Sequence, residues 1–330
     1  MKICLLTTQD LDAIPFAEDD WPCDPRPFMP EADWHVENLT GKDGPARITE
    51  LAEEGFDLFF NLCDGAADED RPGIEVVLTL ERLGVPFSGA TSNYFEPTRG
   101  EMKQQACARE GIATPAYVFA ENAVDIQRAA DQLTFPLFVK HHSSYASVSI
   151  SRASRVATPS GLVRQANKII RRHGRALIEE YVDGAECTVL VAENAEDPSS
   201  PITYMPVRYQ FPKGESFKHA NVKWVDYAGM LAFPVEDPVL NAKLRDVSAR
   251  FFSALGGASF GRCDLRVDAT GTPYMLEINP NCGVYFPPDD YGGADLCLEN
   301  DPAGHEGFTR HLVEAALRRH ERATARSLSP

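Results

Sequence analysis

The chain has 330 residues and a formal net charge of −17. A nucleic-acid partner requires a basic surface, so we expect none for so acidic a chain. No apolar run reaches the roughly 18 residues of a membrane span, and the short apolar start lacks the pattern of a secretory signal. We therefore expect a cytoplasmic protein with no membrane partner, long enough for two or three subdomains.

Strand-like and helix-like segments alternate over residues 1–97. We predict strands at 1–8, 34–39, 56–61 and 86–89, and helices at 46–54 and 74–83. This alternation with short connections is typical of a parallel sheet covered by helices. The stretch 9–30 is rich in Asp and Pro, and we interpret it as a long acidic loop that could act as a lid.

The pattern changes after Pro97. Residues 98–182 predict helices at 98–110, 124–133 and 160–173 and strands at 115–119, 135–140 and 176–182, which together indicate a compact α+β unit. From about residue 183 the sequence predicts further strands, a long helix at 238–255, a hairpin and a helix at 307–323. We therefore divide the chain into three parts, 1–97, 98–182 and 183–330.

The predicted hairpin carries the most informative side chains. Its arms are 261–267 and 273–279, joined by the turn sequence 268–272. Alternation with period two predicts a core face made of Cys263, Leu265, Val267, Tyr274, Leu276 and Ile278. The opposite face then carries Arg262, Asp264, Arg266, Met275, Glu277 and Asn279.

The register of the hairpin decides what that second face can do. If Asp264 lies opposite Glu277, then Arg262 lies opposite Asn279, with facing Cβ atoms about 5 Å apart. Two facing carboxylates repel unless a cation neutralises them, and their oxygens, with the amide oxygen, are ligands that magnesium prefers. Arg262 could then stabilise charge on a transferred phosphoryl group. The alternative is an ordinary solvated sheet face.

The pattern Gly-Arg-x-Asp at 261–264, followed by Tyr-x-Leu-Glu-Ile-Asn at 274–279 and by Gly283, resembles the ATP-grasp superfamily, and within it the D-alanine–D-alanine ligases. The matching segments, in consistent order, are 56–61 with Gly65, 84–89, 111–115, 135–140 and 179–189. The resemblance implies an α/β (α+β) ATP-grasp fold. It combines an N-terminal parallel-sheet preATP-grasp domain with central and C-terminal α+β subdomains that clasp ATP.

The resemblance also implies a nucleotide site. Its ATP-binding residues would be Phe138, Lys140, Glu179, Glu180, Tyr181, Val182, Glu186, Lys223 and Leu276. Lys140 would reach the phosphates as a point charge, while Glu179 and Glu186 would hold the adenine edge and the ribose hydroxyls. Backbone groups of Glu180 and Val182 would pair with adenine, and the aromatic and leucine side chains of the set would sandwich the ring or simply belong to the core.

The implied catalytic residues are Arg262, Lys223 and Ser147, and the implied metal ligands are Asp264, Glu277 and Asn279. They would hold two magnesium ions, with manganese as an alternative. Lys223 has the position of the family's γ-phosphate lysine on a mobile loop, and Lys218 is a nearby competitor. Ser147 has the position of a serine in the phosphate and substrate loop, where 143–149 contains no glycine, so hydroxyls would partly replace backbone N–H contacts.

Several departures from the family concern its substrates. No Gly-Gly-x-Ser-x-Glu motif follows the first strand, and Asp64 replaces a histidine after the third strand. The lysine expected early in the helix at 98–110 is out of register, so Arg99 or Lys103 would substitute for it. An aromatic and acidic segment, 284–295, replaces a Ser-Leu pair. The candidate substrate-binding residues are Asp64, Gly283, Tyr285, Asp289 and Asp290.

The nucleotide half is thus retained while both substrate ends differ. We expect ATP to phosphorylate a carboxylate and an amine to attack the acyl phosphate, giving an amide and ADP. The substrates would be small and amino-acid-like, in a specialised biosynthetic pathway. The alternatives are D-alanine–D-alanine ligation with divergent substrate ends, an ATP-grasp phosphotransferase and a non-catalytic nucleotide-binding module. No P-loop motif is present, and the family resemblance leaves a homodimer open.

Overall fold

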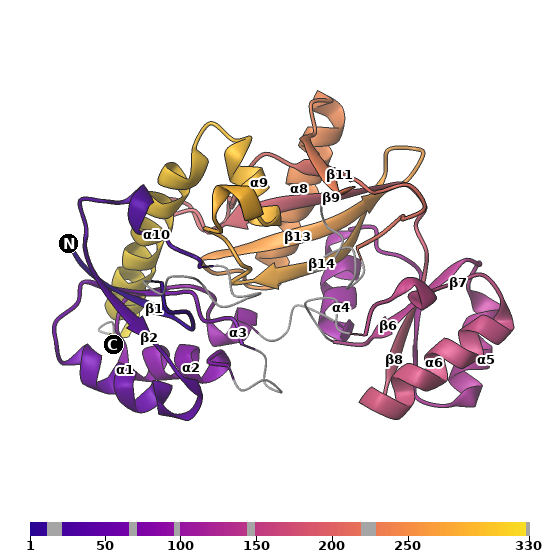
Figure 1. The fold of residues 1–330 in the computed structure, drawn as a ribbon, viewed down its shortest axis with the longest axis horizontal. Helices are drawn as coiled ribbons and strands as arrows, with labels where there is room; N and C mark the ends of the chain where they lie inside the picture. The colour runs from indigo at the N-terminus through magenta and orange to yellow at the C-terminus, as the bar shows by residue number, and fades with distance from the viewer. Residues whose placement is uncertain (12–21, 66–70, 96–99, 144–148, 219–228, 328–330) are drawn as a thin grey trace.

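The computed structural model describes residues 1–11, 22–65, 71–95, 100–143, 149–218 and 229–327. Three sheets organise these residues, with the N-terminal sheet at one end of the molecule, the central sheet at the other and the C-terminal sheet between them (Figure 1). The α/β and α+β character expected from the sequence is confirmed. Ser147, Lys223 and Arg99 lie outside the described residues, so their roles stay predictions.

The N-terminal sheet is parallel, as predicted, with the strand order β2-β1-β3-β4. Its strands are β1 (Lys2–Thr7), β2 (Asp33–Asn38), β3 (Leu58–Asn61) and β4 (Phe87–Ser88), and its helices are α1 (Gly44–Ala52), α2 (Ile74–Leu83) and α3 (Ser92–Phe95). Cys4 and Leu6 pack with α1 and α2, whereas Ile3 and Leu5 belong to a second core on the other face. Alternation along β1 therefore buries both faces of the sheet.

The central sheet is antiparallel, in the order β5-β8-β6-β7. Its elements are β5 (Tyr117–Ala120), α5 (Ala123–Gln132), β6 (Leu137–His141), β7 (Arg155–Val156), α6 (Pro159–His173) and β8 (Ala176–Glu180). Leu137, Val139 and Ile178 face the core that α5 and α6 cover. Because side chains alternate along a strand, Phe138, Lys140 and their neighbours on β8 face the other way.

The C-terminal sheet has the order β12-β11-β9-β13-β14, with β10 paired to β9. Its elements are β9 (Ala185–Ala192), β10 (Ile202–Thr203), β11 (Val207–Gln210), β12 (Leu231–Pro234), α8 (Pro238–Ala254), β13 (Phe260–Val267), β14 (Pro273–Pro280) and α9 (Gly293–Glu299). One face packs against α8 through a core that includes Cys187, Phe251, Cys263 and Leu265. Helix α9 packs on the other face, against β9.

Two helices pack across the division we made from the sequence. Helix α4 (Gly100–Glu110) contributes Ala106 and Cys107 to the core of the C-terminal sheet and contacts α8. Helix α10 (Gly304–Ser327) contributes Phe308 and Leu312 to the core beneath β1 and β3 and contacts β4. The N-terminal and C-terminal parts are consequently joined by shared apolar cores rather than by linkers alone.

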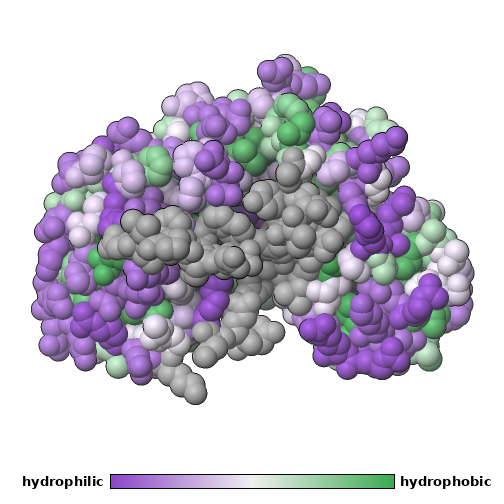
Figure 2. Space-filling model, in the orientation of Figure 1, coloured by the Kyte–Doolittle hydropathy of each residue, from purple (hydrophilic) through white to green (hydrophobic). Residues whose placement is uncertain are grey.

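None of the helices in the described part of the chain combines the length and apolar composition needed to cross a bilayer. On the face seen in Figure 2, hydrophilic side chains predominate and apolar ones are scattered in small groups.

Candidate active site

One face of the C-terminal sheet carries three rows of side chains that cross from strand to strand. The rows are Tyr209, Glu186 and Arg266; Thr188, Asp264 and Glu277; and Leu190, Arg262 and Asn279. Side chains at paired positions lie on the same face, about 5 Å apart. Helices α8 and α4 cover the opposite face. Helix α9 covers Leu190 on this face, so the polar members of the rows form the part that can meet a ligand.

The predicted register of the hairpin is confirmed, since Asp264 pairs with Glu277 and Arg262 pairs with Asn279. A bulge follows, however, and Leu265 pairs with Met275. One extra residue in a strand moves every later side chain to the other face. The predicted faces of Tyr274, Met275 and Leu276 are therefore wrong, and Tyr274 pairs with Arg266 on the polar face. Met275 is fully buried in the core, and Leu276 is partly exposed.

Asp264 is the most constrained carboxylate of the site. Arg262 donates to it through Nε at 3.2 Å and Nη2 at 3.0 Å, and the Thr188 hydroxyl donates at 2.8 Å. Burial opposes the ionisation of Asp264, but Arg262 and Lys218 outweigh it and hold the pKa of this carboxyl well below its usual range. The carboxylate is therefore charged at every physiological pH.

The side chains around Asp264 fit a magnesium site. Asn279 Nδ2 lies 3.1 Å from Asp264 Oδ2 and 3.5 Å from Glu277 Oε1. One amide group thus sits between both carboxylates, and a rotated amide would present its oxygen there. The described residues contain no group of three or more His, Cys, Asp or Glu placed to hold a metal ion. Two carboxylates and an amide nevertheless suit magnesium, which keeps phosphate oxygens and waters as its other ligands.

A buried cluster on the central sheet joins two lysines to one glutamate. Lys103 Nζ lies 2.9 Å from Glu179 Oε1, and Lys140 Nζ lies 2.7 Å from Glu179 Oε2. Burial raises the pKa of Glu179, yet the two lysines outweigh burial and lower it to about 2. Burial lowers the pKa of Lys103 despite the attraction of Glu179. Arg99 and Lys103 were the two candidates for a second cation at the phosphates. The structure places Lys103 beside Lys140.

Aromatic rings gather next to this cluster, where adenine was expected. Phe138 and Tyr181 stack with centroids 6.2 Å apart, and Phe217 meets Phe138 edge-on at 5.0 Å. The Tyr181 hydroxyl donates to the carbonyl of Ser216 at 2.9 Å, which fixes the ring against the connection after β11. The sequence indicated the first two rings and missed Phe217.

The remaining adenine-site residues lie around these rings. The N–H of Glu180 donates to the carbonyl of Ala116, so a contact to adenine from this residue falls to its carbonyl. Val182 is the second residue after β8 and is partly exposed, as is Leu276. These three assignments remain predictions.

Glu186 is held by two cations. Arg266 Nη1 lies 3.3 Å from Glu186 Oε2, and Lys218 Nζ lies 3.6 Å from Oε1. Lys218 Nζ also lies 3.3 Å from the centre of the Tyr209 ring. Burial opposes the charge of Lys218, but Tyr209, Glu186 and Asp264 outweigh it and raise the pKa of the lysine. Lys218 is therefore a permanent cation between the expected ribose ligand and the expected metal ligand.

Replacing Lys218 by Met should raise KM for ATP about tenfold, because a cation that faces Glu186 and Asp264 is removed from an acidic site. Methionine keeps the apolar contact with Tyr209, so the fold should persist. The matched control is Lys213→Met, an exposed lysine on the same connection. Steady-state kinetics with varied ATP would test this, and an unchanged KM and kcat for the Lys218 variant would refute it.

The candidate substrate residues occupy different surroundings. Asp64 follows β3, is about one-third exposed, and pairs with Arg71 at 3.5 Å. A Cβ on Gly283 would lie 2.8 Å from the Phe286 ring, so a larger residue there would require this ring to shift. Asp289 and Asp290 belong to a short 3-10 turn, Pro288–Asp290, and Asp289 is exposed. These positions remain compatible with substrate contact.

Tyr285 is different, because its ring is only 3% exposed and packs in the core beneath the N-terminal sheet. Its backbone adopts φ of 71°, its N–H donates to Asp295 Oδ1 at 2.7 Å, and its hydroxyl accepts from Thr309 at 3.0 Å. His305 contacts the same carboxylate at 2.9 Å. Tyr285 is therefore a packing residue, and the aromatic residue we expected to meet substrate is instead an anchor of segment 284–295.

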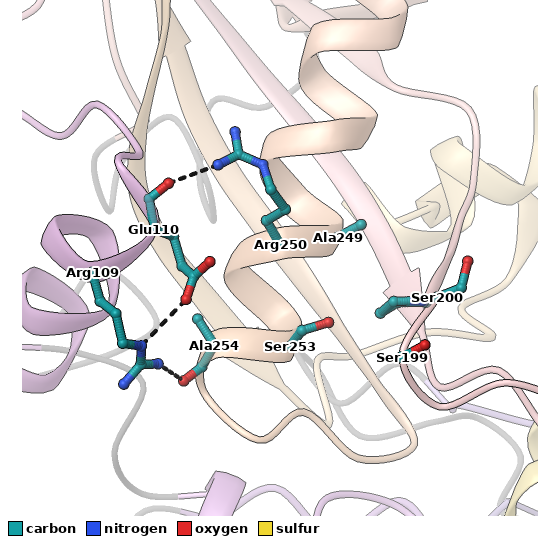
Figure 3. Close-up of a pocket in the computed structure, with 9 residues that line it drawn as sticks. Arg109, Glu110, Ser199, Ser200, Ala249, Arg250, Ser253 and Ala254 are labelled. Carbon is teal, nitrogen blue, oxygen red and sulfur yellow. Dashed lines mark hydrogen bonds and ion pairs between the residues drawn. The ribbon is translucent and has the colours of Figure 1, made fainter.

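A pocket of about 430 Å³ lies elsewhere, between α4, α8 and the turn at 199–201 (Figure 3). Its arginines serve the packing of these helices. Arg250 donates to the carbonyl of Glu110 at 2.8 Å, and Arg109 donates to that of Ala254 and pairs with Glu110 at 3.2 Å. It contains none of the predicted site residues, and we assign it no ligand.

Comparison with known proteins identifies the family of this chain. Residues 107–285 match a family model described as D-ala D-ala ligase C-terminus. The chain is 31% identical over 243 residues to a D-alanine–D-alanine ligase of Aromatoleum aromaticum, covering 71% of this chain and 72% of the relative. It is 27% identical over 279 residues to that of Cupriavidus necator, covering 83% and 80%.

Two solved structures resemble the fold. A D-alanine–D-alanine ligase from Bacillus anthracis gives a TM-score of 0.71 at 19% identity, covering 98% of this chain and 99% of that one. A D-Ala:D-Ser ligase from Enterococcus faecalis gives 0.70 at 14% identity, covering 96% and 99%. At such identities the likeness concerns the fold alone, and it confirms the ATP-grasp architecture.

Proposed function

Because this chain belongs to the D-alanine–D-alanine ligase family and is an ADP-forming ATP-grasp ligase, we propose that it joins a small amino-acid-like carboxylate to an amine in a specialised biosynthetic pathway. The observation that carries the proposal is the hairpin register, with Asp264 facing Glu277 and Arg262 beside them. The lysine pair on Glu179 supplies the second half of a nucleotide site.

The reaction transfers the γ-phosphoryl group of ATP to a carboxylate oxygen, with ADP leaving. The amine then attacks the acyl carbon, phosphate leaves, and the amine loses a proton to give the amide. Lys103 and Lys140 would exchange Glu179 for phosphate oxygens and orient the nucleotide. Arg262 and Lys218 would offset the charge that develops during transfer. Lys223 and Ser147, which lie outside the described part of the chain, are proposed to assist the transfer.

Asp264, Glu277 and Asn279 would hold magnesium, or manganese, as two ions that neutralise the phosphate oxygens. The ionised state of Asp264 suits this role, because Arg262 and Lys218 keep it charged. Arg262 donates to both oxygens of this carboxylate, so the orientation of Asp264 in the metal site is fixed before ATP binds.

D-alanine–D-alanine ligation is the second candidate, and the names of the relatives favour it. The missing Gly-Gly-x-Ser-x-Glu motif and Asp64 in place of the family's histidine disfavour it. An assay with D-alanine as the sole substrate separates the two proposals, since only the second predicts ADP release. We expect no activity in that assay.

A screen of carboxylates crossed with amines, read out as ADP release, tests the main proposal. We expect ADP and phosphate only when both substrate types are present. Phosphorylation of a hydroxyl substrate without an amine would instead support the phosphotransferase alternative. A homodimer remains a separate proposal, and light scattering on the purified chain would test it.

A further inference from the structure

The order in which strands are added to the N-terminal sheet reverses between β1 and β3. From β1 the chain passes to β2 on one side, and from β3 it passes to β4 on the other. In open parallel sheets, ligands bind beyond the carboxyl ends of the strands at such a point. The segments that follow the carboxyl ends of β1 and β3 carry Thr8 and Asp64. These two polar residues therefore lie where a sheet of this kind binds its ligand.

Arg71 connects the two segments. Its Nη2 atom lies 3.2 Å from the Thr8 hydroxyl and 3.5 Å from Asp64 Oδ1. Both contacts use the same nitrogen of a guanidinium that offers five N–H groups in a planar fork. The Arg71 side chain is 51% exposed and that of Asp64 is 35% exposed. A cation and an anion therefore stand side by side within reach of a dissolved molecule.

Two glycines hold this pair in place. Gly65 and Gly73 form an isolated bridge, and Gly65 donates to the carbonyl of Pro72 at 3.0 Å. A Cβ on Gly65 would lie 2.1 Å from the carbonyl oxygen of Arg71, and one on Gly73 would lie 1.9 Å from that of Gly65. Only glycine permits the two segments to approach so closely. Asp64 directly precedes Gly65 and Arg71 lies two residues before Gly73, so the bridge keeps Asp64 and Arg71 close together.

This pair lies beside the metal end of the hairpin. Asn281, which follows β14, donates to the carbonyls of Asn61 and Cys63 at 3.2 and 3.1 Å. These two hydrogen bonds hold the segment that carries Asp64 against the residues that follow Asn279 on β14. A small molecule bound at Asp64 would therefore lie next to the phosphoryl-transfer site.

We propose that Thr8, Asp64 and Arg71 bind the amino-acid end of an acidic amino acid, whose side-chain carboxylate is the group that becomes phosphorylated. Arg71 takes the α-carboxylate in a forked contact, and Asp64 accepts from the ammonium group. The arrangement exploits the opposite charges of the pair. The inference rests on the proposed ligase function and names the class of its acid substrate.

The test compares three kinds of acid, each with the same set of amines: acidic amino acids, the matching dicarboxylates without an amino group, and monocarboxylic amino acids. We expect acidic amino acids to give the fastest ADP release. Arg71→Gln should raise their KM about 10- to 100-fold with little change in kcat, and Arg71→Lys should recover only part, because it lacks the fork. Arg82→Gln, an exposed arginine on α2, is the control.

Asp64→Asn supplies an independent arm. It should raise KM for acidic amino acids while leaving that for plain dicarboxylates unchanged, because only the former carry the ammonium group. Equal activity with monocarboxylic amino acids, or an Arg71→Gln variant with wild-type KM, would overturn the inference. If no acid supports ADP release, the proposed function fails instead. Calorimetric titration of the same acids then tests the site separately. Loss of binding in the Arg71→Gln variant would support the site. Unaltered binding in that variant, or no binding to the wild type, would overturn the inference.

Discussion

An Asp264→Asn variant is expected to lose at least about 100-fold in kcat for ATP-dependent ligation. Asparagine preserves the shape of the side chain but removes the charge that pairs with Arg262 and that would hold the metal. It also leaves Arg262 with a weaker partner in a largely buried position, so some loss of thermal stability should accompany it. ADP release and thermal unfolding should be measured on the same preparation.

Two further variants distinguish chemistry from folding at this site. Glu277→Gln removes the facing carboxylate without depriving Arg262 of its partner, and it should raise the magnesium concentration needed for half-maximal turnover. Asp246→Asn, in an exposed i,i+4 pair on α8, should leave both kinetics and stability nearly unchanged. Full turnover by Asp264→Asn would remove our assignment of the metal site.

The second large effect is expected from Glu179→Gln. Glu179 neutralises Lys103 and Lys140, and Lys103 is only 2% exposed. Removing one partner of a buried ion pair costs about 3–5 kcal/mol of folding free energy, and we expect a loss of that size in denaturant unfolding. Glu101→Gln is the control, because this glutamate lies on α4, the helix that carries Lys103, and forms a solvent-accessible pair with Arg175.

A double variant separates the charge from the shape of the pair. Lys103→Met combined with Glu179→Gln removes the two most buried charges of the cluster and leaves Lys140. It should therefore be more stable than Glu179→Gln alone while remaining poor in ATP binding. A double variant no more stable than the single one would show that the packing of these side chains, rather than their charges, stabilises this region.

The pH dependence has a defined sign. The pKa of Glu179 is lowered from 4.5 to about 2 in the folded chain. Its contribution to stability is therefore fully present above the unfolded-state pKa and is lost as pH falls through the folded-state one. The difference in unfolding free energy between the wild type and Glu179→Gln should shrink between about pH 5 and about pH 2. A constant difference across that range would contradict the ionised pair.

Much of the site could be predicted because its signals are local. Alternation along the hairpin placed Asp264 and Glu277 on one face, where the structure pairs them, and the sheets and most helices follow from periodic apolar residues. The bulge after Asp264 has no such signal, since it depends on how three strands fit together. It moved Met275 into the core and left Leu276 partly exposed.

The missed residues share a different cause. Tyr209 and Phe217 join the site only because β11 pairs with β9 and the following connection folds over the sheet. Tyr285 follows an acidic and aromatic pattern that suggests exposure, yet Asp295 caps its backbone and draws it inward. Such contacts depend on residues distant in sequence or on a backbone conformation that the local pattern does not indicate.

The packing of α10 against β1 and β3 bears on how the chain is made. The strands of the N-terminal sheet are synthesised early, but the face formed by Ile3, Leu5 and Phe60 is completed only by Phe308 and Leu312. A ribosome must translate almost the whole intervening chain before that cover exists. An exposed apolar sheet face is prone to association during this interval. Nascent chains arrested before Gly304 should therefore bind chaperones more strongly than those released after α10 emerges.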